Sequence, residues 1–388
     1  MTNIFVQTGT VLSINLKGLA SRKGLVAATM VCVALVVATL LGLDALTHGL
    51  KRTLEQSGDP AVALIMRGGS QAEINSVITR EQLDILRGAQ GVGPISPEVN
   101  LVVDGYRLED GERTNISMRG ITENGVTLRR GAGLIAGRWP KASAAELVVG
   151  ARIAEGYKGM AIGETIEFGS ANWRIVGHFE TDGDIFESEI WGDLTAVQNL
   201  FERENVVQSV RTKSGGPEGL ASLSALSEKD PRLQLSVKSE AEYYALQASR
   251  TSELAQYLAW PLAILMAVGA VIGAINTMLS SVASRSTEIA TLRVLGYRRF
   301  AVFSSLMIEC VIICTLAGLI GAGLSYLFLD GLSASTLGGG ITSIGYSLEF
   351  TLLGVLQGVV LAVVIGILGA FFPAMMASLR PLTEYLSG

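Results

Sequence analysis

Residue types that carry catalysis are present in this sequence, but their spacing forms no known catalytic motif. The two histidines, His48 and His178, are far apart and stand in no HExxH or CxxC context, so neither indicates a zinc site. No GxxxxGK[ST] phosphate loop and no GxSxG nucleophile turn occur in the chain. The acidic stretch ETDGDIFESE could bind a cation, but it lacks EF-hand spacing and is interpreted as a solvated loop. We therefore expect no catalytic residue, no metal site and no cofactor in this chain, and do not expect an enzyme.

Two polar side chains inside apolar runs are further candidates for chemistry. Glu309 lies within such a run, where an ionised side chain is costly if the run crosses a membrane. It should be paired, protonated or turned towards a polar seam, and Asn276 is a possible hydrogen-bond partner by depth alone. A proton relay normally needs a chain of such groups, so we favour a packing role for Glu309.

Four apolar runs are long enough to cross a bilayer as helices, and these helices must position the polar residues. The chain has 388 residues, of which 49% are hydrophobic and 17% charged, and is therefore too apolar for an ordinary soluble protein. The predicted transmembrane helices are residues 24–46, 257–282, 300–329 and 348–376. The first run is interpreted as a retained helix because the LDALTHGL that follows it lacks a small-x-small cleavage site.

Basic residues beside these runs predict the orientation, because Lys and Arg accumulate on the cytoplasmic side of short flanks. They precede the first run, occupy segment 283–299 and follow the fourth run, whereas the connection between the third and fourth runs has none. Both termini, 1–23 and 377–388, are therefore predicted in the cytoplasm. The polar region 47–256 and the short loop 330–347 are predicted outside it.

The polar region predicts an extracytoplasmic α+β domain. The segments AVALIMRG, TREQLDILRG and ISPEVNLVVDGY predict a strand, a helix capped by Thr79 and a second strand, and residues 206–239 predict another β-α-β unit. Residues 116–204 contain short strands between glycine turns, which indicates a mostly β insert and hence two subdomains. The predicted fold class is membrane α-helical, with four transmembrane helices and a large α+β domain made of a βαβ-type subdomain and the insert.

Small residues recur at every fourth position of the last apolar run. They are Gly354, Gly358, Ala362, Gly366 and Ala370. A shorter series in the second run includes Gly269 and Gly273. Such series let two helices approach closely, so we predict tight helix contacts rather than a wide aqueous pore.

The stretch EIATLRVLGYRR is predicted to form a short cytoplasmic helix between the second and third runs. Ile289, Leu292 and Leu295 recur at helical spacing, and Gly296 suits the C-terminal stop. The polar rim of this helix comprises Glu288, Arg293, Arg298 and Arg299. One interpretation places the helix on the membrane surface, with its arginines on lipid phosphates. The other inserts its apolar side chains into a groove of a partner protein.

The order of one span, a large external domain and three spans resembles the FtsX-like permeases, the membrane subunits of ABC transporters of the MacB, LolC and LolE class. Two motifs carry the resemblance: INTMLSSVASRSTEIATLRVLGYRR, residues 275–299, and FPAMMASLRPLTEYL, residues 372–386. Glu309 also matches a glutamate often found in this family. MacB carries its ATPase in the same chain, whereas this sequence has no room for one.

The resemblance implies a permease subunit whose partner ATPase binds ATP and Mg²⁺ and contacts segment 283–299 as a coupling helix. It implies a homodimer of permease copies in the bacterial inner membrane, whose periplasmic domains move during export or extraction of a lipid, lipoprotein, peptide or drug. Membrane lipid, a periplasmic adaptor and an outer-membrane channel are further expected partners. The net charge of -5 gives no reason to expect nucleic acid. The alternative function is a signalling subunit that activates an external cell-wall hydrolase.

Overall fold

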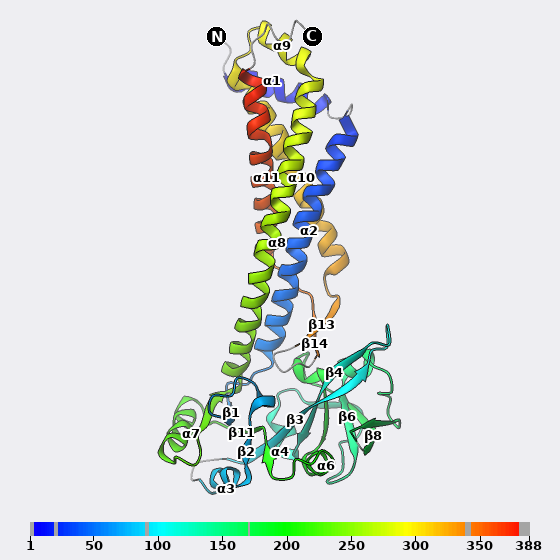
Figure 1. Ribbon diagram of the computed structural model, residues 1–388, viewed down its shortest axis with the longest axis vertical. Coiled ribbons are helices and arrows are strands. Elements are labelled where there is room, and N and C mark those ends of the chain that lie inside the picture. The colour runs from blue at the N-terminus through cyan, green and yellow to red at the C-terminus, as the bar shows by residue number, and fades with distance from the viewer. Residues whose placement is uncertain (1–3, 19–21, 90–92, 170, 338–342, 380–388) are drawn as a thin grey trace. The chain divides into compact units, whose positions relative to one another are not determined.

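The computed structural model describes residues 4–18, 22–89, 93–169, 171–337 and 343–379 (Figure 1). The chain divides into two compact units. One unit, here called the helix bundle, comprises residues 1–48, 254–332 and 348–388, and the other, here called the sheet domain, comprises residues 49–253 and 333–347. The chain leaves the bundle within helix α2 (Lys23–Gln56) and returns to it within helix α8 (Glu240–Ser284).

The remaining helices of the bundle are α1 (Ile4–Lys17), α9 (Ser286–Val294), α10 (Arg299–Leu329) and α11 (Leu352–Leu379). By length and composition, α2, the part of α8 from Ala259, α10 and α11 could each cross a membrane. Helices α2 and α8 extend beyond the predicted spans, since α2 continues past residue 46 and α8 begins before residue 257. The extension of α8, residues 240–256, is rich in Ala, Glu, Leu and Gln, and that of α2, residues 47–56, contains Leu, Lys, Arg, Glu and Gln; these residue types favour a helix beyond the apolar run.

The small residues of α11 lie against two neighbouring helices. A Cβ atom added at Gly358 would lie 3.0 Å from Cγ1 of Val37 on α2, and one at Gly366 would lie 3.0 Å from Cα of Val311 on α10. Gly354, Ala362 and Ala370 are buried as well. This face therefore leaves no room for larger side chains at Gly358 and Gly366.

The corresponding series on α8 behaves differently. A Cβ atom added at Gly269 or Gly273 would meet no other atom of the described residues within 4 Å. These two glycines therefore make no tight contact within the described part of the chain, whereas Thr277 and Ser281, which continue the predicted series, bond to Thr29 and Arg22.

The strands of the sheet domain are β1 (Val62–Arg67), β2 (Ile78–Thr79), β3 (Ile95–Tyr106), β4 (Arg113–Ile121), β5 (Gly133–Gly137), β6 (Glu146–Gly150), β7 (Thr165–Phe168), β8 (Ala171–Glu180), β9 (Glu189–Asp193), β10 (Val206–Val207), β11 (Ser209–Lys213) and β12 (Leu235–Ser239). One ten-stranded sheet has the order β12-β1-β11-β3-β4-β9-β6-β8-β5, with β7 on β8, and β2 pairs with β10. Its helices are α3 (Arg80–Gly88), α4 (Glu123–Leu128), α5 (Ala151–Gly156), α6 (Leu194–Leu200) and α7 (Pro217–Lys229), with 3-10 turns η2 (Glu73–Asn75) and η3 (Ile185–Ser188).

Two interleaved βαβ units form one part of this sheet. β1, α3 and β3 make the first unit, and β11, α7 and β12 the second. The pairs β12–β1, β1–β11 and β11–β3 are all antiparallel, so the two strands of each unit are parallel and separated by a strand of the other. This is the split βαβ arrangement. The predicted fold class, four apolar helices with a large α/β domain, is confirmed.

Strand β3 joins this part to the mostly β part. Residues 95–98 pair with β11, and residues 99–106 pair with β4. The predicted start of a separate β insert at residue 116 is therefore wrong, because β3 is long enough to pair on both sides and makes the sheet continuous.

Three further predictions are corrected by the structure or lie outside it. The acidic stretch 180–189 is not a solvated loop, because η3 is buried and Oε1 of Glu187 accepts the backbone N–H groups of Thr181 and Gly183. The loop 330–347 forms the strands β13 (Ser333–Leu337) and β14 (Ser343–Ser347) of a hairpin. The predicted tail 377–388 lies outside the described residues from residue 380 onwards.

Candidate functional site

Helix α9 and the residues that fix it form the candidate site. The helix has nine residues, and Gly296 ends it with a φ of 92°, a left-handed conformation that favours glycine. The N–H groups of Gly296 and Tyr297 donate to the carbonyl oxygens of Arg293 and Leu292, which is the Schellman pattern. Helix α10 then starts at Arg299, so α9 is a discrete element with a defined end, as EIATLRVLGYRR predicts.

The predicted apolar face of α9 is wrong in one respect. Ile289 is only 4% exposed and packs in the core of the bundle, whereas Leu295 is 71% exposed. Six residues at 3.6 per turn leave these two side chains about 120° apart, so they cannot enter one groove. The exposed apolar pair is instead Val294, at 66%, with Leu295, while Leu292 is half-buried.

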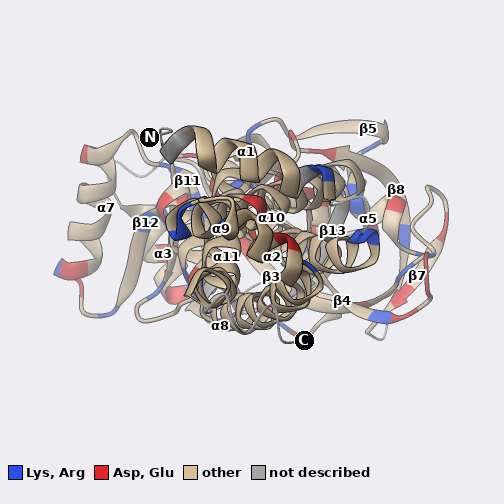
Figure 2. Cartoon of the chain, turned by 90° about the horizontal axis from the view of Figure 1, so that it is seen from above, with Lys and Arg blue, Asp and Glu red and all other residues tan. Residues whose placement is uncertain are grey.

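The charged residues of the predicted rim have different environments; Figure 2 colours the Lys and Arg residues of the chain blue and its Asp and Glu residues red. Glu288 is exposed and pairs with Nε of Arg285 at 3.1 Å. Arg298 and Arg299 are exposed, and the backbone N–H of Arg298 donates to Gln7 of α1. Arg293 is half-buried.

Glu309 lies at the centre of an ion cluster that holds the start of α9. Its side chain is 1% exposed, and its two oxygens lie 3.5 Å from Nη2 of Arg22 and 3.4 Å from Nη1 of Arg285. Arg285 precedes α9 as its N-cap residue and also donates to Oδ1 of Asn15 on α1. Arg22 also donates to Oγ of Ser281 on α8. These five residues, here called the Glu309 cluster, join α1, α8, α9 and α10 to the start of α2.

The predicted pairing of Glu309 with Asn276 is wrong. Asn276 is exposed on α8, and the carboxylate is satisfied by the two arginines instead. Arg22 and Arg285 stand beside the apolar runs, where a long side chain can reach a buried acid from the end of the helix.

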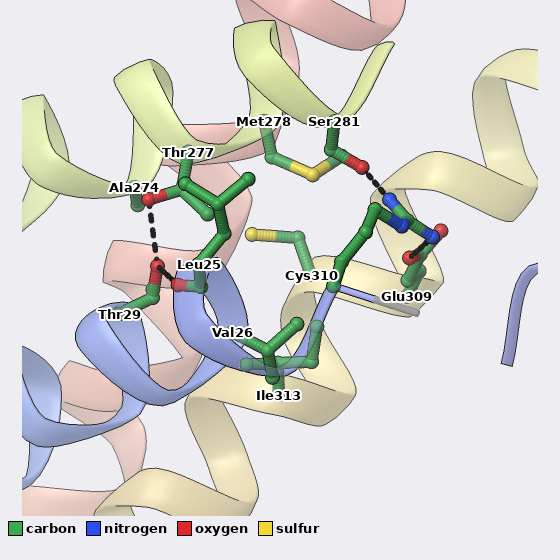
Figure 3. Close-up of a pocket in the computed structure, with 11 residues that line it drawn as sticks. Leu25, Val26, Thr29, Ala274, Thr277, Met278, Ser281, Glu309, Cys310 and Ile313 are labelled. Carbon is green, nitrogen blue, oxygen red and sulfur yellow. Dashed lines mark hydrogen bonds and ion pairs between the residues drawn. The ribbon is translucent and has the colours of Figure 1, made fainter. Parts of the chain in front are cut away.

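A cavity of about 20 Å³ adjoins the Glu309 cluster (Figure 3). Thr29 and Thr277 form a hydrogen bond of 2.8 Å on one side of it, and Ser281 and Glu309 lie on the other. Its volume is close to that of one water molecule, so the cavity is too small for a transported substrate. The arrangement can fix helices relative to one another but cannot pass a ligand.

The sheet domain contains a second and larger group of buried charges, here called the sheet-domain network. Its members are Glu73, Glu98, Glu189, Glu240, Arg119, Arg129 and Arg211. Arg211 pairs with Glu73 at 2.9 Å, with Glu98 at 2.6 Å and with Glu240 at 2.8 Å. Arg119 pairs with Glu189 at 2.6 Å. Short charge-assisted bonds on every member offset the cost of burial.

Burial and pairing compete for the protonation of these carboxyl groups. Burial opposes ionisation of Glu98, yet Arg129 and Arg211 lower its pKa to about 2. Burial raises the pKa of Glu240 in spite of Arg211, and it raises the pKa of the neighbouring acid Asp184 to about 7. Within the described residues, no group of three His, Cys, Asp or Glu side chains could hold a metal.

Comparison with known families agrees with this division of the chain. The MacB-like periplasmic core domain matches residues 26–225, and the FtsX-like permease C-terminal domain matches residues 261–381. The first match covers just over half of the chain. This chain belongs to the FtsX-like permease family of ABC transporters. Its sheet domain is the MacB-like periplasmic core of this permease.

Individual relatives of the permease are distant. A probable export ATP-binding/permease protein of Pseudomonas fluorescens is 27% identical over 56% of this chain and 34% of its own length. The macrolide export ATP-binding/permease protein MacB of Hahella chejuensis is also 27% identical, over 56% of this chain and 33% of its own. The chain thus spans about a third of the length of these curated relatives. The periplasmic region of MacB from Actinobacillus actinomycetemcomitans matches 47% of this chain and 90% of its own, with 14% identity and a TM-score of 0.37.

Sequence reasoning found Glu309 but not the residues around it. Asn15 and Arg22 are far from Glu309 in the sequence, and Arg285 is 24 residues from it. A basic residue at the end of an apolar run gives the same sequence pattern whether it faces lipid or a buried acid. The sheet-domain network was also missed. Its one local signal is the charge placed within apolar strands, as at Glu98, Arg119 and Arg211.

Proposed function

We propose that this permease couples ATP hydrolysis by a partner ATPase to movement of its sheet domain. We further propose that α9 contacts the ATPase and transmits its conformational change to the permease. The observation that carries the proposal is the difference in burial between the first half of α9 and its C-terminal end. Ile289 and Ala290 are buried in the bundle, whereas Val294 and Leu295 are exposed beside a defined helix end. An exposed apolar pair with charges around it suits a groove on another protein.

The Glu309 cluster supports this role because it connects α9 to several helices at once. Arg285, at the start of α9, contacts Glu309 on α10 and Asn15 on α1. A force applied to α9 would therefore reach α10 directly. Chain continuity adds a second route, since α8 ends immediately before α9 and begins in the sheet domain.

We further propose that two copies act together in the bacterial inner membrane, with both termini in the cytoplasm and the sheet domain in the periplasm. The substrate is then an amphipathic molecule exported from the periplasm or the outer leaflet, with an adaptor and an outer-membrane channel as partners. The relatives named for macrolide export favour export over signalling.

Copurification of the ATPase with the detergent-solubilised permease tests the coupling role. Leu295→Asp places an unpaired charge in the apolar contact and should lower the retained ATPase by about tenfold or more, while the permease still inserts. Thr287→Ala, on the same helix without added charge, should retain the ATPase. Full retention with Leu295→Asp would overturn the assignment of α9.

A further inference from the structure

The helix bundle contains a larger cavity, lined by α2, α8 and α11. Its volume is about 350 Å³, within the usual range for small-molecule sites. Leu40, Leu41 and Leu353 contribute apolar surface, and Asp44 and Trp260 contribute a carboxylate and an indole. Apolar walls with a few convergent polar groups are typical of a ligand pocket.

The charge of the lining restricts the ligand. Asp44 is the one acid among the described lining residues, and none of them is Lys or Arg. Its side chain is 24% exposed, and its partners in the described residues are Thr351, at 3.4 Å, and His48, at 3.3 Å. An ionised carboxylate has about four acceptor positions, so Asp44 retains capacity for a further donor.

Trp260 adds a second group suited to a cation. The indole is the aromatic ring that binds cations most strongly, and Trp260 lines the same cavity as Asp44. It lies next to Pro261, near the end of the apolar part of α8. Tryptophan at such a position accommodates both an apolar chain and a polar headgroup.

We propose that this cavity binds an amphiphile with a protonated amine headgroup, with the amine at Asp44 and Trp260 and the apolar chain along the leucines. A cavity in the sheet domain has a lining of different charge. It has about 200 Å³ and is lined by Arg80 and Arg87 as well as Glu204, so it offers no comparable preference for a cation. The proposal names the substrate class of the export function proposed above and rests on that function.

Fluorescence quenching of the full chain in nanodiscs tests the proposal without the ATPase, so that failure of amine binding and failure of ATPase pairing are separate results. The probes are dodecylamine, dodecanol and dodecanoic acid, each brominated on the chain so that it quenches a nearby tryptophan. Trp260→Phe gives the background from the other three of the four tryptophans. The amine should quench Trp260 saturably, at a half-saturating concentration about tenfold below that of the other two probes.

Asp44→Asn should raise the half-saturating concentration of the amine to that of the alcohol, because the neutral amide loses the charge attraction. Glu55→Gln is the matched control, since it removes the same charge from an exposed position of the same helix. Ala259→Phe fills the cavity and leaves Asp44 in place, and should abolish saturable quenching by the amine. Equal quenching by all three probes, an unchanged Asp44→Asn variant, or tight amine binding to Ala259→Phe would each overturn the proposal.

Discussion

The two groups of buried charge in this permease are built differently. In the sheet-domain network, Arg211 pairs with three carboxylates at 2.6–2.9 Å. In the Glu309 cluster, one carboxylate pairs with two guanidinium groups at 3.4–3.5 Å. The network fixes strands and the start of α8 within a closed core, whereas the cluster holds several separate helices around one carboxylate whose ion pairs are longer. The network is therefore suited to maintain one structure, and the contrast favours the proposal that the cluster transmits a change of helix position.

The largest expected effect of a single substitution is at the centre of the network. Arg211→Met removes the one guanidinium group that pairs with Glu73, Glu98 and Glu240 and should lower the free energy of unfolding by about 3–5 kcal/mol, the usual loss when a buried ion pair is broken. Urea unfolding followed by tryptophan fluorescence, chiefly of the buried Trp173 and Trp191, measures it.

Arg232→Met is the matched control for this substitution. Arg232 pairs with Asp230 at the surface and is 63% exposed, so its loss should lower the free energy of unfolding far less than the loss of Arg211 does. If the two arginine variants unfold at the same urea concentration, the network is not the core that we describe.

A smaller effect is expected in the bundle, where small residues rather than charges limit the approach of helices. Gly366→Leu forces a side chain against Val311 and Cys314 of α10 and should destabilise the bundle by about 1–3 kcal/mol. Val360→Leu on the same helix is 53% exposed and should be close to neutral. Thermal unfolding in detergent compares the two variants, and equal midpoints would contradict the packing account.

The pH dependence of stability should distinguish the sheet-domain network from Asp184, the acid beside it. Burial raises the pKa of Asp184 from 3.8 to about 7, so the contribution of this group to stability is complete below pH 4 and is lost as the pH rises to 7, by at most about 1.4 kcal/mol per pH unit. Asp184→Asn should remove this loss. Glu98 acts in the opposite direction because its pKa is lowered to about 2. Its contribution to the stability of the protein is lost as the pH falls from 4.5 to 2.

Urea midpoints of the full chain at pH 5 and pH 8 measure the Asp184 effect. The difference between the two pH values should be smaller in Asp184→Asn than in the unchanged chain. The same difference in both would show that Asp184 is ionised throughout this range.

Local patterns predicted most elements of the fold. The strand ISPEVNLVVDGY coincides with β3, and the helix after Thr79 has the predicted cap, with a capping box to Gln82. These features depend on neighbours within a few residues, which the sequence displays directly.

The features that sequence did not predict all depend on distant residues. The pairing of β3 with both β11 and β4, and the contact of Arg22 with Glu309 across 287 positions, leave no local periodicity. The face of α9 illustrates the same limit. Ile289 and Leu295 are equally apolar, and only the packing of the bundle determines which of them is buried.

The most direct test of the account is the ATPase rate stimulated by the permease in reconstituted vesicles, compared between Glu309→Gln and the unchanged chain. The glutamine leaves Ser281 and Asn15 as partners of the two arginines but removes the charge that joins them to α10. We predict that the variant retains its ATPase on purification but that stimulation falls by about tenfold, equivalent to 1.4 kcal/mol. Unchanged stimulation would contradict a transmitting role for the Glu309 cluster, and so would loss of the ATPase itself.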